Sequence, residues 1–456
     1  MSMRAAAAAD TRAAGEAFVF TSTRDPSGRA GFSTALLQGL APDGGLYVPL
    51  SWPQLPLTAF DGAVSLAEVA PPLLAPFLAG DGLASELQSI AEEAFDFPAP
   101  LVPLRPDGRL SVLELFHGPT AAFKDFGARF LAACFARLRA REARPLTILV
   151  ATSGDTGGAV AAAFHRRSGI EVAVLFPKGL VSPTQERQLT CWGENVRALS
   201  VRGTFDDCQR LVKEAFQDPQ LRERRALSSA NSINLGRLLP QAVYYAATSL
   251  VVAREHGAPA SFIIPSGNLG NSVACLWARK LGLPIGEVVL AHNANRGVPD
   301  FLGGADWCPR PSIATLASAM DVGNPSNMER LRALYPQVEQ LRGAVSAVSV
   351  TDEEIRARIR AGFRTYGQIW CPHTATAAEA WERLPPERRA RGHWVLAATA
   401  HPAKFREIVE PLIQATVPVP ETLARLFARP ARCAEIDASL AALRAALDDQ
   451  GGGWTT

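Results

Sequence analysis

The chain has 456 residues, of which 48% are hydrophobic and 20% are charged, and its formal net charge is +2. A chain of this length can form two or three domains around a large core. So small a net charge gives no electrostatic basis for binding nucleic acid or an anionic membrane, and neither is expected as a partner.

The seven cysteines are widely spaced and include no Cys-x-x-Cys pair, and the seven histidines show no metal-like spacing. A disulfide framework or a metal site is therefore not expected, and a reducing, cytoplasmic compartment is favoured. No apolar run is long enough to span a bilayer. Residues 1–17 are rich in alanine and lack the apolar core of a secretory signal, so we expect a disordered leader there.

Residues 18–100 are predicted to form a mostly helical N-terminal domain that begins with a short strand. The segment 32–40 has a Ser/Thr start and helical apolar spacing, and several helices punctuated by proline are expected at about 65–95. Taken alone, most of this unit would be an ordinary helical cap on the rest of the chain.

From residue 101 onward, strand-like apolar runs alternate with helix-like stretches. The predicted strands are 110–115, 146–152, 171–176, 196–201, 261–265, 287–291, 345–350 and 393–399, and helices are expected at 157–168, 182–194 and 204–217. This alternation predicts an α/β fold with doubly wound, mainly parallel sheets.

A long helix at about 237–256 is expected to separate two lobes of a large domain that spans 101–430. The smaller lobe would hold about 140–236, and the larger lobe would hold 101–139 with 257–415. Residues 431–456 would form a C-terminal helix and tail, with an amphipathic helix at 434–448.

One lysine, Lys124, stands among small and aromatic residues in the segment HGPTAAFKDFGARF, residues 117–130. Partial desolvation between Phe123 and Phe126 would lower the pKa of this lysine and leave more free amine to attack a carbonyl. Asp125 could orient the lysine or cap a helix.

Three loops of small residues follow predicted strands: TSGDTGG (152–158), PSGNLGN (265–271) and TAHPAKF (399–405). In a parallel sheet such loops gather at the carboxyl ends of the strands. Backbone N–H groups at a strand-to-helix turn can hold an anion, although each loop taken alone could be a plain turn. A reactive lysine near such loops fits an aldehyde cofactor that carries a phosphate, and pyridoxal phosphate is such a cofactor.

These motifs, in this order and spacing, resemble those of the threonine synthase family, which belongs to the tryptophan-synthase-β-like, fold type II group of pyridoxal phosphate enzymes. Further matching segments are TSTRDPSGRAGFSTALLQGLAPDGGLYVP (21–49), SPTQERQLT (182–190), NSINLGRLLPQAVYY (231–245), MDVGNPSN (320–327) and PHTATA (372–377). The resemblance covers about residues 20–415 and implies a two-lobed fold type II core.

The resemblance also implies a role for each matching residue. Lys124 would be the catalytic lysine that forms a Schiff base with the cofactor. The remaining cofactor contacts would be Gly267, Asn268, Leu269 and Asn271 at the phosphate and Thr399 at the pyridine nitrogen. Ser153, Asp155 and Thr156 would hold the substrate carboxylate. Asn234 and Arg237 lie in a polar cluster, and Arg237 is either a clamp on the substrate phosphate or part of a salt bridge between the lobes.

The implied reaction converts O-phospho-L-homoserine and water to L-threonine and phosphate, in an enzyme that is a monomer or a homodimer. Three alternatives stay open on the residues: a phospholyase that releases 2-oxobutyrate, a serine/threonine dehydratase, and a catalytically silent protein that only binds the cofactor. Phosphate-directed features such as Arg237 disfavour the dehydratase, and an intact Lys124 with intact loops disfavours the silent protein.

Overall fold

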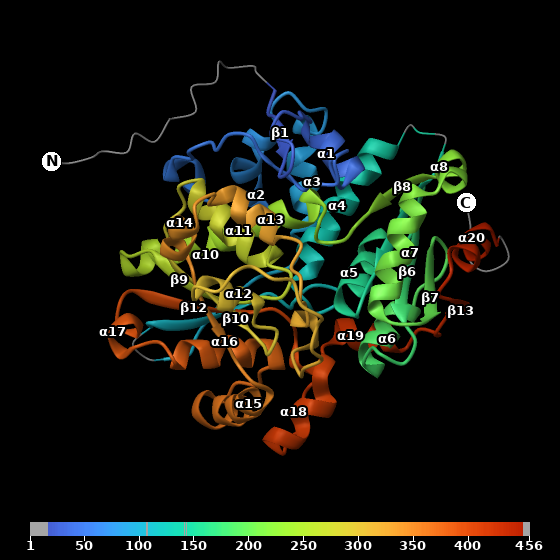
Figure 1. Ribbon diagram of the computed structural model, residues 1–456. Coiled ribbons are helices and arrows are strands. Elements are labelled where there is room, and N and C mark those ends of the chain that lie inside the picture. The colour runs from blue at the N-terminus through green and yellow to red at the C-terminus, as the bar shows by residue number, and fades with distance from the viewer. Residues whose placement is uncertain (1–16, 106–107, 141, 143, 450–456) are drawn as a thin grey trace.

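The computed structural model describes residues 17–105, 108–140, 142 and 144–449. The expected leader therefore lies outside the described residues, apart from Ala17. Figure 1 shows an N-terminal unit, in blue, packed over two α/β regions that lie side by side. The predicted α/β class with mainly parallel sheets is confirmed, because both large sheets are parallel apart from one edge strand.

The N-terminal unit combines a small antiparallel pair of strands with short helices. The strands are β1 (Phe20–Ser22) and β2 (Tyr47–Pro49), and the helices are α1 (Phe32–Gln38), α2 (Leu66–Leu74) and α3 (Leu87–Ala94). Helix α2 begins at a capping box, in which Ser65 accepts from the Glu68 amide and the Glu68 side chain accepts from the Ser65 amide.

The larger sheet has the strand order β11-β10-β9-β12-β4-β3. Its strands are β3 (Leu101–Pro103), β4 (Leu110–Glu114), β9 (Ala260–Pro265), β10 (Ile285–His292), β11 (Ser346–Ser349) and β12 (His393–Ala398). Strands β9 and β12 are buried throughout, which explains why they read as continuous apolar runs in the sequence and not as alternating ones. Only β3 runs antiparallel to its neighbour.

The smaller sheet has the order β13-β7-β6-β5-β8, with every neighbouring pair parallel. Its strands are β5 (Leu146–Ala151), β6 (Ile170–Pro177), β7 (Val196–Arg202), β8 (Ala226–Ser229) and β13 (Ala434–Asp437). In Figure 1 this sheet lies on the right, mostly in green, with the red β13 at its edge.

Helices connect the parallel strands and cover the sheets. Those from Lys124 to His256 are α4 (Lys124–Arg139), α5 (Asp155–Phe164), α6 (Pro183–Thr190), α7 (Phe205–Gln217), α8 (Pro219–Arg224), α9 (Leu235–Leu238) and α10 (Ala242–His256). The later ones are α11 (Gly270–Lys280), α12 (Gly297–Leu302), α13 (Met328–Leu334), α14 (Val338–Ala344), α15 (Asp352–Tyr366), α16 (Pro372–Glu382), α17 (Pro386–Arg389), α18 (Arg406–Ile413), α19 (Glu421–Phe427) and α20 (Leu440–Asp448). No helix in the described part of the chain is long and apolar enough to cross a bilayer.

The prediction of a single long helix at 237–256 is wrong for its first turns. The chain instead forms α9, a 3₁₀ turn at Leu239–Gln241 and then α10. Pro240 lies inside the 3₁₀ turn, and a proline cannot donate the backbone hydrogen bond that a continuous helix would need there.

The amphipathic helix expected at 434–448 is also wrong in its first part. Residues 434–437 form β13, which pairs with β7, and the helix begins only at Leu440. Ser439 is the N-cap and accepts from the Ala442 amide. Ile436 is buried in a cluster with Leu199 and Val201, so packing against the sheet edge decides the conformation of this segment.

Helix α4 lies very close to α9, and a glycine makes this approach possible. A Cβ atom added at Gly127 would lie 2.3 Å from the backbone oxygen of Arg237. We therefore predict that Gly127→Ala lowers the free energy of unfolding by about 1–3 kcal/mol, because a backbone atom cannot move aside as a flexible side chain could. Urea-induced unfolding followed by circular dichroism measures this.

Gly343→Ala is the matched control, since Gly343 also lies in a helix but a Cβ atom there meets nothing within 4 Å. Alanine favours helix over glycine by about 0.8–1.0 kcal/mol, so this variant should be neutral or slightly stabilised. Equal effects of the two substitutions would contradict the steric explanation.

Candidate active site

A cavity of about 290 Å³ lies at the carboxyl ends of strands from both sheets. It is reached by the ends of β5, β9 and β12 and by the loops that follow them. The structure brings ten of the eleven predicted site residues to its wall: Lys124, Ser153, Asp155, Thr156, Arg237, Gly267, Asn268, Leu269, Asn271 and Thr399. Asn234 is not in the lining.

Lys124 is the first residue of α4, and the segment before it is attached to the extension of β12. The Phe123 amide donates to the Thr399 carbonyl at 2.9 Å, and the His401 amide donates to the Ala121 carbonyl at 3.0 Å. Ala121 has a φ of 53°, a left-handed conformation that an L-residue adopts only under constraint from its surroundings. The lysine is thus held in a fixed place at the cavity wall.

The environment of the Lys124 side chain favours a neutral amine. Its exposed fraction is 15%, and Nζ lies 4.9 Å from the centre of the Phe123 ring. Burial lowers the pKa of Lys124 below its usual value, and the nearby charges of Lys404 and Arg237 act in the same direction, whereas Asp155 opposes them. A lysine with a lowered pKa can act as a nucleophile and as a base near neutral pH.

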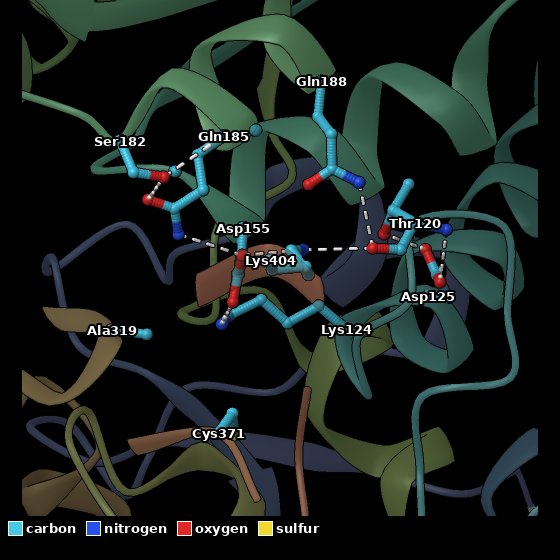
Figure 2. Close-up of polar contacts among 12 residues, drawn as sticks. Thr120, Lys124, Asp125, Asp155, Ser182, Gln185, Gln188, Ala319, Cys371 and Lys404 are labelled. Atoms are coloured by element: carbon cyan, nitrogen blue, oxygen red, sulfur yellow. Dashed lines mark hydrogen bonds and ion pairs between the residues drawn. The ribbon is translucent and has the colours of Figure 1, made fainter. Parts of the chain in front are cut away.

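Asp155, at the start of α5, lies between two lysines. Its Oδ2 is 3.5 Å from Lys124 Nζ, and its Oδ1 is 2.7 Å from Lys404 Nζ (Figure 2). Gln185 Nε2 also donates to Oδ1, at 3.1 Å. Although burial opposes it, the neighbouring lysines, Lys404 above all, hold the pKa of Asp155 well below its usual range. The carboxylate therefore acts as an anion among cations, and its own oxygens are unsuited to contact a substrate carboxylate.

The loop before α11 has the shape of an anion site. A Cβ atom at Gly267 would lie 2.7 Å from the Met320 Cα, so only glycine lets the backbone lie this close. Leu269 has a φ of 63° and turns the chain into α11, which starts at Gly270. The first N–H groups of a helix lack intrahelical acceptors and favour negative charge.

Asn271 adds a donor to this loop. Its Oδ1 accepts from the hydroxyl groups of Tyr244, at 2.5 Å, and Tyr245, at 2.9 Å. These two bonds fix the orientation of the Asn271 side-chain amide, because both hydroxyls donate to Oδ1. The amide nitrogen, Nδ2, is buried without a hydrogen-bond partner among the described residues. A buried donor without a partner is costly, so a ligand acceptor beside it is expected. The loop therefore fits a phosphate group.

Arg237 also lines the cavity with unused donor capacity. One of its terminal nitrogens donates to the Ala230 carbonyl, while its buried Nε has no partner among the described residues. Burial lowers the pKa of Arg237 to about 10. No carboxylate in the described part of the chain forms an ion pair with it, so the salt bridge considered as its alternative role is not observed.

Asn234 has a structural place in the fold. It is completely buried, its Nδ2 donates to the carbonyls of Leu36 and Ser229, and its Oδ1 accepts from the Gly236 amide as the N-cap of α9. All of these contacts lie within the protein framework. We therefore find no site contact for this residue.

The cavity wall also contains a histidine from α16 that is buried and neutral. His373 Nε2 accepts from the Ala319 amide at 3.2 Å, and burial lowers the pKa of His373 to about 4. The neighbouring Cys371 is buried, which raises the pKa of its thiol. Neither group is set up as a nucleophile.

The sequence analysis did not assign Gln185, Gln188 and Lys404 to the site. Gln188 Nε2 and Lys404 Nζ both donate to the Thr120 carbonyl, each at 3.0 Å. The glutamines belong to the motif 182–190 and Lys404 belongs to the motif 399–405. These motifs do not reveal which groups the three side chains contact.

Comparison with known proteins places these features in one family. A sequence model described as "Pyridoxal-phosphate dependent enzyme" matches residues 95–399. Models described as "Threonine synthase N terminus" and "Threonine synthase, C-terminal" match residues 19–95 and 374–447. The last match extends beyond residue 415, where the sequence resemblance was expected to end.

Individual relatives agree with these matches. The chain is 39% identical over 428 residues to threonine synthase of Haemophilus influenzae, covering 93% of this chain and 98% of that protein. It is 38% identical over 425 residues to threonine synthase of Escherichia coli strain K12, covering 92% and 97%.

A solved structure agrees as well. The fold matches the crystal structure of PLP-bound threonine synthase from Brucella melitensis with a TM-score of 0.86 and 35% identity, covering 94% of this chain and 99% of that one. The lysine, the strand-end loops and these full-length matches lead to one conclusion: the chain belongs to the threonine synthase family of pyridoxal-phosphate-dependent enzymes.

Proposed function

We propose that this chain converts O-phospho-L-homoserine and water to L-threonine and phosphate. The observation that carries the proposal is that one cavity contains a desolvated lysine together with two places for phosphate, at the α11 loop and at Arg237. The reaction needs both places, because the cofactor and the substrate each carry a phosphate. We further propose that the enzyme works in the cytoplasm as a monomer or a homodimer.

The residues of the α11 loop would hold the cofactor phosphate. Backbone N–H groups from Gly267 to Asn271 and the Nδ2 of Asn271 supply the donors. Thr399 lines the same cavity beside Lys124 and would face the pyridine nitrogen. Bound pyridoxal phosphate supplies an electron-accepting ring that stabilises negative charge on the substrate carbon next to the amino group.

Lys124 would carry the proton transfers. Because burial lowers its pKa, Lys124 gives up its proton more readily than an exposed lysine, and the free amine can remove the proton from the substrate Cα and deliver it to another carbon. The strained Ala121 and the bonds to the β12 extension keep the amine in place between these steps.

The start of α5 would orient the substrate carboxylate. Ser153 and Thr156 line the cavity, and the amides at the helix start favour an anion. The Asp155 side chain would not take part directly, because it is occupied by Lys404, Lys124 and Gln185.

Replacement of the lysine tests the assignment of Lys124. We expect Lys124→Ala to lose phosphate release from O-phosphohomoserine and to lose the covalent attachment of pyridoxal phosphate that borohydride reduction fixes. Peptide mass spectrometry locates the attached group, and amino-acid analysis identifies the product. In the parent protein, threonine and phosphate should appear in a one-to-one ratio.

Lys178→Ala is the matched control, because Lys178 is a surface lysine paired with Glu435. It should keep turnover and attachment. Attachment of the cofactor to another lysine, or release of phosphate with 2-oxobutyrate and no threonine, would count against the proposal.

A second prediction concerns Arg237. A hydrogen bond to a charged group contributes about 1.5–3 kcal/mol, so Arg237→Gln should raise the KM for O-phosphohomoserine about tenfold to a hundredfold with a smaller effect on kcat. Steady-state kinetics of phosphate release measures both constants.

Arg279→Gln provides the control, since Arg279 is a partly buried arginine whose bonds to Gly286, Ala344 and Tyr335 lie outside the cavity. An unchanged KM in Arg237→Gln, with stability reduced as in the control, would assign Arg237 a structural role only.

A further inference from the structure

The assigned chemistry leaves a second buried lysine beside the reactive one. The Lys404 side chain has an exposed fraction of 0% and belongs to the 3₁₀ turn Pro402–Phe405 that follows β12. Its ammonium group lies 2.7 Å from Asp155 Oδ1 and 3.0 Å from the Thr120 carbonyl oxygen (Figure 2). A lysine is rarely buried completely unless it is paired, and the partner of Lys404 is the Asp155 carboxylate.

The Asp155 carboxylate is shared unequally between Lys404 and Lys124. Asp155 Oδ1 receives Lys404 at 2.7 Å and Gln185 at 3.1 Å, whereas Oδ2 lies 3.5 Å from Lys124. One carboxylate carries one negative charge, and the closer ammonium neutralises most of it. Lys124 is left with the longer and weaker contact.

The Thr120 carbonyl is the second acceptor that fixes the position of Lys404. The Thr120 carbonyl that accepts from it also accepts from Gln188, while the Thr120 amide and hydroxyl donate to the Asp125 carboxylate at 2.8 and 2.6 Å. Figure 2 shows Lys404 lying between the Thr120 and Asp155 contacts. Moving the ammonium away would therefore break both of its contacts and leave a buried cation without an acceptor.

We propose that Lys404 is a positioning residue that neutralises Asp155 and thereby keeps the Lys124 amine free to react. Without Lys404, the buried carboxylate would have Lys124 as its nearest cation and would draw it into the charged form. With Lys404 in place, Asp155 still orients the Lys124 amine but does not hold its proton. The inference rests on the proposed role of Lys124 as the reacting lysine.

The charged groups that act on Lys124 in the described part of the chain come from three elements. Lys404 from the turn after β12 and Arg237 from α9 lower the pKa of Lys124, and Asp155 from α5 raises it. His373 from α16 faces Asp155 and is neutral, because burial lowers its pKa to about 4. Asp155 is thus the one nearby group among the described residues that favours the ammonium form, and Lys404 is its closest counter-charge.

The test measures the pKa of Lys124 itself in the full-length chain after the cofactor has been removed. Lysines are acetylated with a trace of acetic anhydride from pH 6 to 11, and peptide mass spectrometry follows the labelling of Lys124 with Lys178 as the surface reference. We expect Lys404→Met to raise the pKa of Lys124 by about one unit, which lowers its labelling at pH 7 about tenfold. Lys404→Arg, which keeps the charge, should stay near the parent.

Two further variants separate the charge effect from a loss of structure. Asp155→Asn leaves Lys404 as an unneutralised cation and should lower the pKa of Lys124, whereas the double variant Asp155→Asn with Lys404→Met should lower it less. The pKa of Lys124 should therefore be highest in Lys404→Met, followed by the parent protein and the double variant, and lowest in Asp155→Asn. If Lys404→Met does not fold, comparing Asp155→Asn with the double variant still measures the effect of Lys404 on the pKa of Lys124.

A pKa of Lys124 that is the same with and without Lys404, in both comparisons, would overturn the proposal and leave Lys404 a structural role. This result is independent of substrate and turnover. The proposed function fails separately, if borohydride reduction of the loaded parent protein does not fix the cofactor on Lys124.

Discussion

The carboxylate of Asp155 is the point at which the elements of the two large sheets are joined in the wall of the cavity. Asp155 begins the helix that follows β5 of the smaller sheet, whereas Lys404 follows β12 of the larger sheet and Lys124 begins α4. A buried charge must be paired, and this one is paired with lysines from elements far apart in the sequence. The arrangement of the lysines, and with it the chemistry, therefore depends on how the sheets pack.

Burial acts differently on the groups around the cavity. It lowers the pKa values of Lys124, Arg237 and His373, and it raises that of the Cys371 thiol. The result is a neutral histidine and a thiol that is not ionised, with the charge concentrated in a small set of lysine, arginine and aspartate groups. A site of this kind favours anionic ligands over nonspecific nucleophilic chemistry.

Backbone constraints are concentrated at the same place. Ala121 and Leu269 both adopt left-handed conformations, one shortly before Lys124 and the other immediately before α11. Each costs conformational energy and persists because surrounding contacts hold it, such as the bond from His401 to the Ala121 carbonyl. Gly267 serves the same end without strain, because the absence of a side chain lets its backbone lie against Met320.

The sequence by itself determined the class of fold, most of the parallel strands along the chain and the loops that meet at the cavity. These follow from local properties: apolar runs of strand length, small residues at turns, and motifs such as that around Lys124. Ten of the eleven site residues that the family resemblance implied line the cavity. Those in the loops after β9 and β12 do so because the carboxyl ends of parallel strands lie at one edge of the larger sheet.

Only the tertiary structure decided which side chains are partners. Asn234 looked like a site residue, but its amide is used by the Leu36 and Ser229 carbonyls. Lys404 had no assigned role in the sequence analysis, but its side chain is buried against Asp155. Residues 434–437 had a helical pattern, yet they complete a sheet edge beside β7. In each case the deciding contact joins segments distant in the sequence, and no local pattern encodes the packing that brings such segments together.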